Sequence, residues 1–271
     1  MKIAIISDND LIWSLPTWER VLLTLKKNKY VVTGFWTCPP KLANIKDWKI
    51  PFYYLHTFGF GNFFKLSLFT ILATLTRWFS IVYGHRVLNF KGLCAQSRIP
   101  FYVCQGPNDP LFYCWVQDQE VDVVIIMCSY ILKDKTISSP KLGIINKHAA
   151  LLPANKGLFP YFWARLKNQK QGVSFHMVVR KIDGGKVLAQ EYVPSYHTQS
   201  MIDFYFYVYR QRYADMLIES LNRLSSGQHI DQSHNYPASY HGLPTQDDYI
   251  KFRKQGGKII RWRDVLIALK L

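Results

Sequence analysis

The first 36 residues constrain the fold most strongly, because they alternate between strand and helix patterns. Residues 2–7 form a short apolar run that suits a buried strand, and residues 30–36 form a second one. Between them, residues 16–27 predict a helix with a proline in its first turn. A β-α-β succession places its two strands parallel in one sheet. We therefore predict an α/β fold with a mostly parallel sheet, for which a chain of 271 residues can bury a full core.

Polar side chains stand at the ends of two later strand-like runs. Residues 143–146 suit a buried strand that ends in Asn146 and His148, and residues 173–179 lead toward Asp183. Residues two apart on an extended backbone point to the same face, so Asn146 and His148 would look into one cleft. Two glycines after Asp183 allow a tight turn there. Open α/β sheets bind ligands beyond the carboxyl ends of their strands, where these three side chains could meet.

This stretch resembles the formyltransferases that use 10-formyltetrahydrofolate, whose signature is Asn-x-His, then Ser-Leu-Leu-Pro, then a distant Asp. The matching residues are Asn146, His148, the Leu-Leu-Pro of residues 151–153, and Asp183. The sequence departs from the pattern with two alanines, residues 149–150, where Pro-Ser or a similar small pair is usual. The resemblance covers roughly the first two thirds of the chain. It implies a Rossmann-like formyltransferase core, with residues 1–195 as the catalytic domain and residues 196–271 as a small C-terminal helix and basic tail.

The resemblance also implies a role for each of the three polar residues. Asn146 would donate to the oxyanion that forms on the formyl group, and His148 would donate to it or take the proton of the attacking amine. Asp183 would orient or charge the imidazole, and no covalent enzyme intermediate is needed. Each residue alone has a structural interpretation: a turn cap for Asn146, a buried core histidine for His148, and an Asp-Gly turn for Asp183. Their combination with Leu-Leu-Pro favours catalysis.

The implied ligands are 10-formyltetrahydrofolate as co-substrate, with no metal, and a nucleotide-linked amino sugar as acceptor. Residues near the ends of the strand runs at 121–127 and 173–179 are assigned to folate: Cys128, Tyr130, Leu132, Val178, Val179 and Lys181. A second set is assigned to the acceptor: Asn9, Leu152, Pro153, Phe159 and Tyr161. Trp163 and His176 are interpreted as packing residues.

Three branches of this family compete for the assignment. The loop of residues 7–14 contains no glycine to cradle a phosphate, which disfavours the purine-pathway enzyme. Residues after 190 suggest a long helix over 200–224, a linker over 225–237 and a last helix over 263–271, which disfavours the barrel of the methionyl-tRNA enzymes. The sugar N-formyltransferases, which serve surface polysaccharide synthesis, fit best. The alternatives are a methionyl-tRNA formyltransferase-like enzyme and a catalytically silent fold that binds folate or nucleic acid.

Charge and cysteine content give less specific information about binding partners than the motif does. The chain has 34 Lys and Arg against 18 Asp and Glu, a net charge of +16, which suits polyanionic partners or a basic solvated surface. Five cysteines without Cys-x-x-Cys spacing indicate neither a disulfide framework nor a zinc site. No secretory signal begins the chain, so we expect a cytoplasmic protein. The aromatic-rich helix of residues 200–224 favours a homodimer.

Residues 58–82 form the most apolar stretch of the sequence. Lys65 and Arg77 interrupt it, so it is a poor transmembrane span. We predict a helix of the core, with a helix that lies on a membrane or against a partner subunit as the alternative. Further helices are predicted over residues 88–98 and over 108–119, the second capped by Asn108, with a strand over 99–103 between them.

Overall fold

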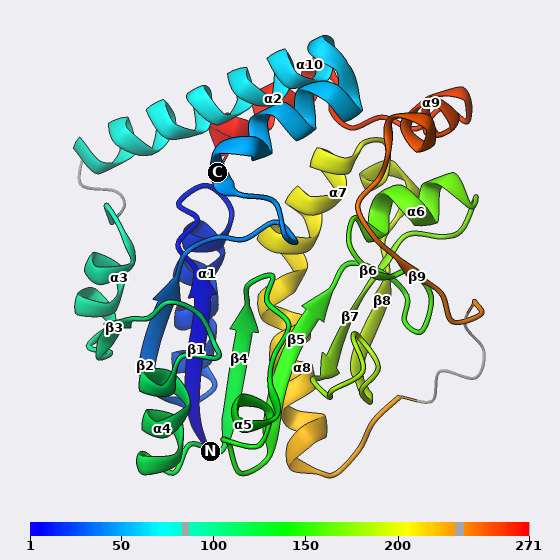
Figure 1. The fold of residues 1–271 in the computed structure, drawn as a ribbon. Helices are drawn as coiled ribbons and strands as arrows, with labels where there is room; N and C mark the ends of the chain where they lie inside the picture. Colours follow the sequence, from blue (N-terminus) through cyan, green and yellow to red (C-terminus); the bar gives the residue numbers. More distant parts are fainter. Residues whose placement is uncertain (83–86, 231–235, 271) are drawn as a thin grey trace.

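The computed structural model describes residues 1–82, 87–230 and 236–270. A seven-stranded sheet in the order β3-β2-β1-β4-β5-β7-β8 forms its centre (Figure 1). Neighbours from β3 to β5 run parallel, and β7 and β8 are antiparallel to their neighbours. The strands are β1 (Lys2–Asp8), β2 (Val31–Cys38), β3 (Phe101–Val103), β4 (Val123–Met127), β5 (Gly143–His148), β7 (Gly172–Met177) and β8 (Val187–Tyr192). The predicted α/β fold with a mostly parallel sheet is confirmed.

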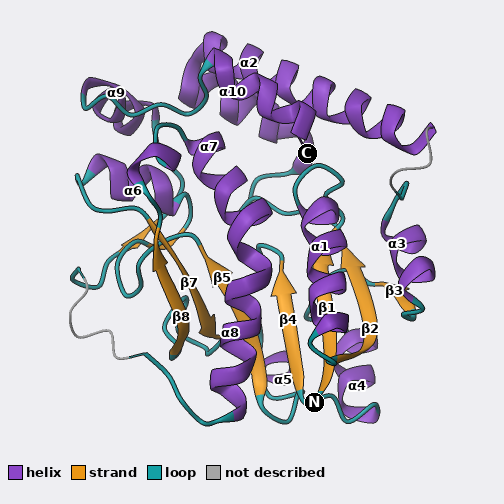
Figure 2. Cartoon of the chain, turned by 180° about the vertical axis from the view of Figure 1, so that it is seen from behind, coloured by secondary structure: helices purple, strands orange, loops and turns teal. Residues whose placement is uncertain are grey.

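Helices cover both faces of the sheet (Figure 2). The side chains of β1 alternate between two hydrophobic clusters, as the period of a strand requires. Ile3 and Ile5 pack with residues of α1 and α8, whereas Ala4 and Ile6 pack with residues of α4. The helices that cover the sheet are α1 (Ser14–Lys27), α3 (Phe90–Ser97), α4 (Pro110–Asp118), α5 (Asp134–Ile137), α6 (Pro160–Leu166) and α8 (Tyr213–Ser225).

The N-terminal cap of α4 differs from the prediction. Asp109, not Asn108, caps the helix, and its Oδ1 accepts from the backbone N–H of Leu111 at 3.0 Å. Pro110 follows it at the first helical position, where no N–H donor is needed. The Asn108 side chain instead accepts from the N–H of Lys133 at 2.8 Å and donates to the carbonyl of Ile131 at 2.9 Å. Asn108 therefore fixes the loop that follows β4.

The helix predicted over residues 200–224 is a continuous helical run with a change of geometry in its middle. It consists of α7 (Met201–Phe206), a π-helical segment (Tyr207–Arg212) and α8. A π-helical turn shifts the side chains that follow it around the axis, and such turns are frequent at functional sites. Within the segment, the hydroxyl of Tyr209 accepts a hydrogen bond from Lys147 at the end of β5.

Helix α2 (Ile50–Val82) follows a 3₁₀ turn (Asp47–Lys49) and runs along the edge where β1, β2 and β4 end (Figure 1). The prediction of a core helix is wrong, because only 17% of its most apolar 18-residue window is buried. Residues 47–80 are long and apolar enough to cross a membrane, by length and composition alone. Gly59, at φ 77°, interrupts the helical geometry near its start.

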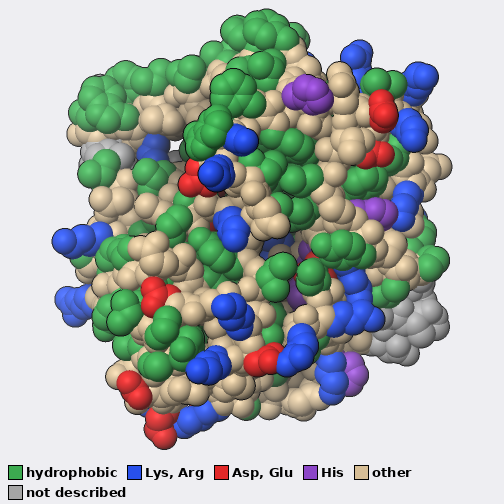
Figure 3. Space-filling view, in the orientation of Figure 1, with side chains coloured by type: hydrophobic (Ala, Val, Ile, Leu, Met, Phe, Trp, Pro, Cys, Tyr) green, Lys and Arg blue, Asp and Glu red, His purple; other side chains and the backbone are tan. Residues whose placement is uncertain are grey.

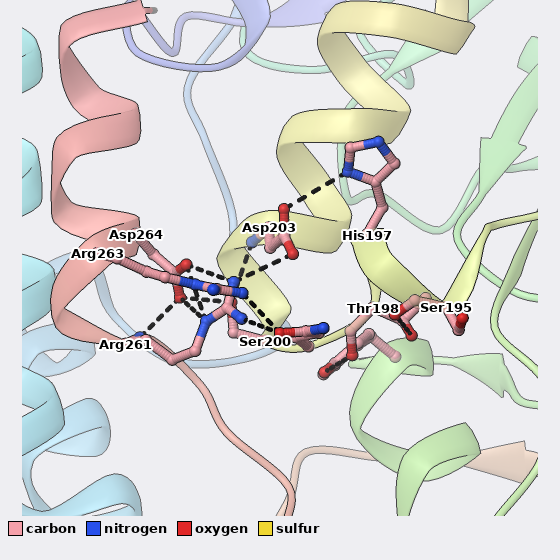
Figure 4. Close-up of polar contacts among 10 residues, drawn as sticks. Ser195, His197, Thr198, Ser200, Asp203, Arg261, Arg263 and Asp264 are labelled. Carbon is pink, nitrogen blue, oxygen red and sulfur yellow. Dashed lines mark hydrogen bonds and ion pairs between the residues drawn. The ribbon is translucent and has the colours of Figure 1, made fainter.

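The C-terminal segment packs against α2 and against α6. Its elements are β9 (Tyr240–His241), which pairs with β6 (Lys156–Gly157), then α9 (Gln246–Lys254), α10 (Trp262–Val265) and a 3₁₀ turn (Leu266–Lys270). The helix predicted over residues 263–271 thus divides into α10 and this turn. Arg261 ties the segment to α7, because its guanidinium bonds to Asp264 at 2.6 Å and to Asp203 at 3.1 Å (Figure 4). Asp264 is buried and also accepts from the hydroxyl of Ser200.

Candidate active site

The antiparallel pairing of β5 with β7 brings the predicted polar residues together. Asn146 lies opposite His176, and His148 lies opposite Ser174. Asp183 stands in the turn after β7, with φ 45°, and the chain then returns past Met177 at Gly185. A side chain at Gly185 would meet the Met177 carbonyl at 1.9 Å, so the turn requires glycine there.

The carboxylate of Asp183 lies between two imidazoles. Its Oδ2 is 3.4 Å from Nδ1 of His148, and its Oδ1 is 3.5 Å from Nε2 of His176. The backbone N–H of Gly157 also donates to Oδ2, at 2.8 Å. Burial alone would raise the pKa of Asp183, but the neighbouring histidines and the Gly157 N–H hold that pKa well below its usual range. Asp183 is therefore ionised at neutral pH.

His148 is buried and has a hydrogen-bond acceptor beside each ring nitrogen. Its Nε2 is 2.8 Å from the carbonyl oxygen of Asn155, which can only accept, and Nδ1 faces the carboxylate of Asp183. Burial lowers the pKa of His148, although Asp183 opposes this effect, so the ring is neutral at rest. A neutral ring carries one proton and can satisfy only one of the two acceptors. A second proton, taken up at Nδ1, would be stabilised at once by Asp183.

One cavity lies beside Asn146 and Asp183, at the ends of β4, β5 and β7. It has a volume of about 80 Å³ and apolar walls that include Ile126 and Ile182. Five of the six residues assigned to folate from the sequence line it, namely Cys128, Tyr130, Leu132, Val178 and Val179. Lys181 is not among the lining residues. His176, interpreted from the sequence as a packing residue, lines this cavity as well and faces Asp183.

A larger cleft lies on the other side of His148. It has a volume of about 750 Å³ and is bounded by β5, α2, α7 and the loop that follows β1. Asn146 and His148 were expected to look into one cleft, but the structure places Asn146 on the small cavity and His148 on the large cleft. Since His148 contacts Asp183, the His148–Asp183 pair forms the partition between the two.

Only one of the five residues assigned to the acceptor, Phe159, lines the large cleft. Asn9 is exposed between two residues that do line it, and Leu152 is buried in the core. Pro153 also lies outside the lining. Tyr161 is buried as well, and its hydroxyl donates to the carbonyl of Thr198. Trp163, expected in the core, is half-buried and stacks on the ring of His241.

The large cleft contains charged groups that the sequence analysis did not select. Asp8 is the last residue of β1, Asp10 follows two residues later, and Lys147 stands between Asn146 and His148. Burial raises the pKa of Asp8 to about 7, and burial lowers the pKa of Lys147 to about 8. The ammonium of Lys147 donates to the hydroxyl of Tyr209 at 2.9 Å and lies over its ring. The sequence feature that could have identified Asp8 and Asp10 as site residues is their position directly after the predicted strand of residues 2–7.

The position of the site follows from the order of the strands. The chain leaves β1 toward β2 on one side and later enters β4 on the other side, so the order reverses between β1 and β4. Open α/β sheets bind ligands at such a reversal, outside the carboxyl ends of the strands. Asp8 ends β1 and Ser129 follows β4, and both line the large cleft.

Comparison with known proteins is consistent with this geometry. Residues 108–219 match the family model described as formyl transferase. A methionyl-tRNA formyltransferase from Azobacteroides pseudotrichonymphae is 31% identical over 111 residues, which is 41% of this chain and 34% of that protein. The chain thus spans about a third of the length of the curated relatives that it matches.

Several solved structures share the fold at low sequence identity. Glycinamide ribonucleotide transformylase 1 from Symbiobacterium toebii has a TM-score of 0.56 at 14% identity, covering 86% of this chain and 91% of its own. A sugar N-formyltransferase from Shewanella sp FDAARGOS_354 has a TM-score of 0.56 at 15% identity, with 94% and 87% covered. The N-formyltransferase from Helicobacter canadensis, solved with folinic acid and dTDP-3-aminofucose, has a TM-score of 0.51 at 16% identity, with 89% and 70% covered.

The family match includes the motif at residues 146–183, and the structural neighbours share the fold. The matched region, 108–219, contains Asn146, His148 and Asp183, and so includes the whole partition between the two cavities. Residues 108–219 of the chain therefore match a formyl transferase domain.

Proposed function

We propose that this protein is an N-formyltransferase that moves a formyl group from 10-formyltetrahydrofolate to the amine of a sugar. The observation that carries this proposal is the His148–Asp183 pair, which separates a small apolar cavity from a large cleft. In a direct transfer the amine and the formyl group must meet beside one acid–base group, and the His148–Asp183 pair lies where the small cavity and the large cleft adjoin. The two acceptor groups around His148 favour a ring that gains a proton during the reaction.

The small cavity is the proposed site of the formyl donor. Its apolar walls suit the flat face of a pterin, and Asn146 and Asp183 stand at its end. A cavity of about 80 Å³ holds only part of such a ring, so binding would displace side chains at its mouth. Ile131 is 73% exposed, and Arg180 is exposed in an ion pair with Asp134, so both side chains are free of the core.

In the proposed reaction, the amine nitrogen attacks the formyl carbon and a C–N bond forms. The carbonyl oxygen becomes an oxyanion, to which the amide of Asn146 would donate. The amine proton passes to Nδ1 of His148, and Asp183 stabilises the resulting imidazolium. The oxyanion then returns to a carbonyl as the bond between the formyl carbon and N10 of the folate breaks, and N10 takes the proton from the imidazolium, so that His148 becomes neutral again.

The large cleft is the proposed site of the amino sugar. Phe159, Tyr205 and Tyr209 offer aromatic faces to a sugar ring, and Asp8 and Asp10 offer carboxylates to its amine. We infer a nucleotide carrier from the likeness to sugar N-formyltransferases. Lys147 is the one Lys or Arg among the described residues that line the cleft, so the phosphates of such a carrier would lie outside this lining.

A second candidate acceptor is methionyl-tRNA. Three curated proteins that are similar in sequence are methionyl-tRNA formyltransferases, and the net charge of +16 suits a nucleic acid. The relative from Azobacteroides pseudotrichonymphae is similar over only 41% of the chain, and the family match at residues 108–219 holds the donor side and the partition. We therefore rank the amino sugar first.

The test is release of tetrahydrofolate from 10-formyltetrahydrofolate, with a panel of nucleotide-linked amino sugars and initiator methionyl-tRNA offered separately. We expect turnover with an amino sugar and none with His148→Ala. Turnover with the tRNA alone would replace the acceptor but keep the site. A protein that binds folate and shows no turnover with any amine would refute the proposed activity.

A further inference from the structure

Helix α2 is apolar on two opposite faces. Phe58, Phe69 and Ala73 are buried against the protein. A second set of apolar residues is exposed on the helix at spacings of three, four and seven, which place them on one side: Phe60, Phe64, Ile71, Leu75, Trp78 and Val82. We call this set the outer stripe. A helix that is apolar all round is ordinarily surrounded by apolar material, and the outer half of α2 has none among the residues that the structure describes.

The outer stripe is uncharged although the chain is strongly basic. Residues 50–82 contain no Asp or Glu, and their only Lys and Arg are Lys65 and Arg77. Lys65 donates to the carbonyl of Ile260 at 3.2 Å. Arg77 is buried and bonds to Glu19 at 3.0 Å and to the carbonyl of Val87. Both cations therefore point toward the protein and leave the stripe without charge.

A basic groove of about 810 Å³ lies beside the first part of α2. Four cationic residues line it: Arg253 and Lys258, together with Lys65, which donates to the carbonyl of Ile260, and Arg261, which is paired with Asp203 and Asp264. No Asp or Glu is found among its described lining residues. Phe60 is 72% exposed and Trp262 is 62% exposed, and both belong to this lining. Figure 3 shows hydrophobic side chains along the edge formed by α2, and both Lys or Arg and Asp or Glu side chains over α9.

We propose that the outer stripe and the basic groove dock this protein on the surface of an anionic lipid bilayer. Exposed aromatic rings would enter the interface between head groups and acyl chains, while the neighbouring cations bind the phosphates. The charges favour this occupant over a second copy of the chain. A twofold contact would place the same basic groove on both sides of the interface, close to its own image.

The helix lies on the bilayer in this proposal and does not cross it. Its inner face is held by the core at Phe69 and Ala73, and Arg77 is paired inside the protein. Ile71 belongs both to the outer stripe and to the lining of the large cleft, so the cleft opens beside the docked face. The docking does not depend on the proposed activity, but it would place the acceptor site at a lipid surface.

Vesicle flotation of the full chain tests the proposal. We expect binding to phosphatidylcholine vesicles that contain phosphatidylglycerol, weaker binding to phosphatidylcholine alone, and release by high salt. The variant Phe60→Glu/Phe64→Glu should lower the partition constant about 100-fold, because each phenyl ring contributes about tenfold when it leaves water. Arg253→Glu/Lys258→Glu should remove the preference for anionic lipid. Leu111→Glu is the matched control, since Leu111 is 67% exposed on α4 at the opposite edge of the sheet.

Tetrahydrofolate release with a soluble acceptor is measured separately and should be unchanged in Phe60→Glu/Phe64→Glu, which keeps the docking claim apart from the proposed activity. Absence of flotation with anionic vesicles would overturn the proposal. A wild-type dimer that Phe60→Glu/Phe64→Glu converts to a monomer, without lipid binding, would assign the stripe to a second copy instead. Resistance of the bound protein to carbonate extraction would overturn the surface orientation.

Discussion

The small cavity and the large cleft share the His148–Asp183 pair but differ in how the chain builds them. The small cavity is formed at the ends of three strands that are neighbours in the sheet, β4, β5 and β7. The large cleft combines the loop after β1, the end of β5, α2, and the helical run that contains the π-helical segment. Its shape therefore depends on elements outside the sheet. Changes in α2 or α7 can alter the acceptor side without disturbing the donor side.

The largest effect is expected where the two sides meet. His148→Ala and Asn146→Ala should each cost about 2.7–4 kcal/mol of transition-state stabilisation, a fall of about 10²–10³ in kcat, as loss of an oxyanion donor does. Each change should alter the KM for the donor and the KM for the acceptor to the same extent. Steady-state kinetics with each substrate varied in turn measures this. Full activity of His148→Ala would refute the site.

A bulky residue in the small cavity should raise the KM for the donor and leave the KM for the acceptor unchanged. Val179 is partly exposed at the small cavity, and Val179→Trp would fill that space. Overpacking of this kind costs about 1–3 kcal/mol, so we expect the KM for 10-formyltetrahydrofolate to rise about tenfold or more. The acceptor KM should not change. An equal rise in both KM values would show that the cavities are not independent.

A matching change on the acceptor side is Asp8→Asn. The asparagine keeps the shape of the side chain and can still accept from Ser14, but it loses the charge that would bind an amine. We expect the acceptor KM to rise about tenfold, the effect of losing a hydrogen bond to a charged group. Isothermal titration with the donor should give wild-type affinity for this variant. A rise confined to the donor KM would contradict the assignment of the two sides.

The smallest expected effect is a pH dependence of the acceptor KM alone. Burial raises the pKa of Asp8 to about 7, so Asp8 loses its negative charge as the pH falls through 7. The acceptor KM should therefore rise by at most about tenfold between pH 7 and pH 6, while the donor KM stays constant. Asp8→Asn should abolish this trend. A trend of the same size in that variant would assign the titration to another group.

The sequence predicted the sheet and the approach of His148 to Asp183 because both depend on local patterns, but it did not predict the partition between two cavities. Asn146 and His148 are fixed by one strand, and Asp183 is fixed by a glycine turn, so a short motif determines their geometry. The large cleft was predicted poorly, because its lining comes from segments distant in the chain. Tyr161 is buried and does not line the large cleft, and its hydroxyl donates to a backbone carbonyl instead.

Helix α2 marks a second limit of prediction from the sequence. Its apolar composition fits a core helix and a surface helix equally well, since periodicity does not reveal what covers a second apolar face. Lys65 and Arg77 were interpreted as interruptions of an apolar segment. In the structure, Lys65 bonds to the carbonyl of Ile260 and Arg77 bonds to Glu19, so both connect the helix to the rest of the protein.

The most direct test of the central claim is to identify the product. The protein is incubated with 10-formyltetrahydrofolate and the amino sugar that supports turnover, and the product is analysed by mass spectrometry and NMR. A formamide on the sugar nitrogen, formed by the wild type and lost in His148→Ala, is the result that we predict. Tetrahydrofolate released without a formylated amine, or a formylated amine made equally well by His148→Ala, would contradict transfer across the His148–Asp183 partition.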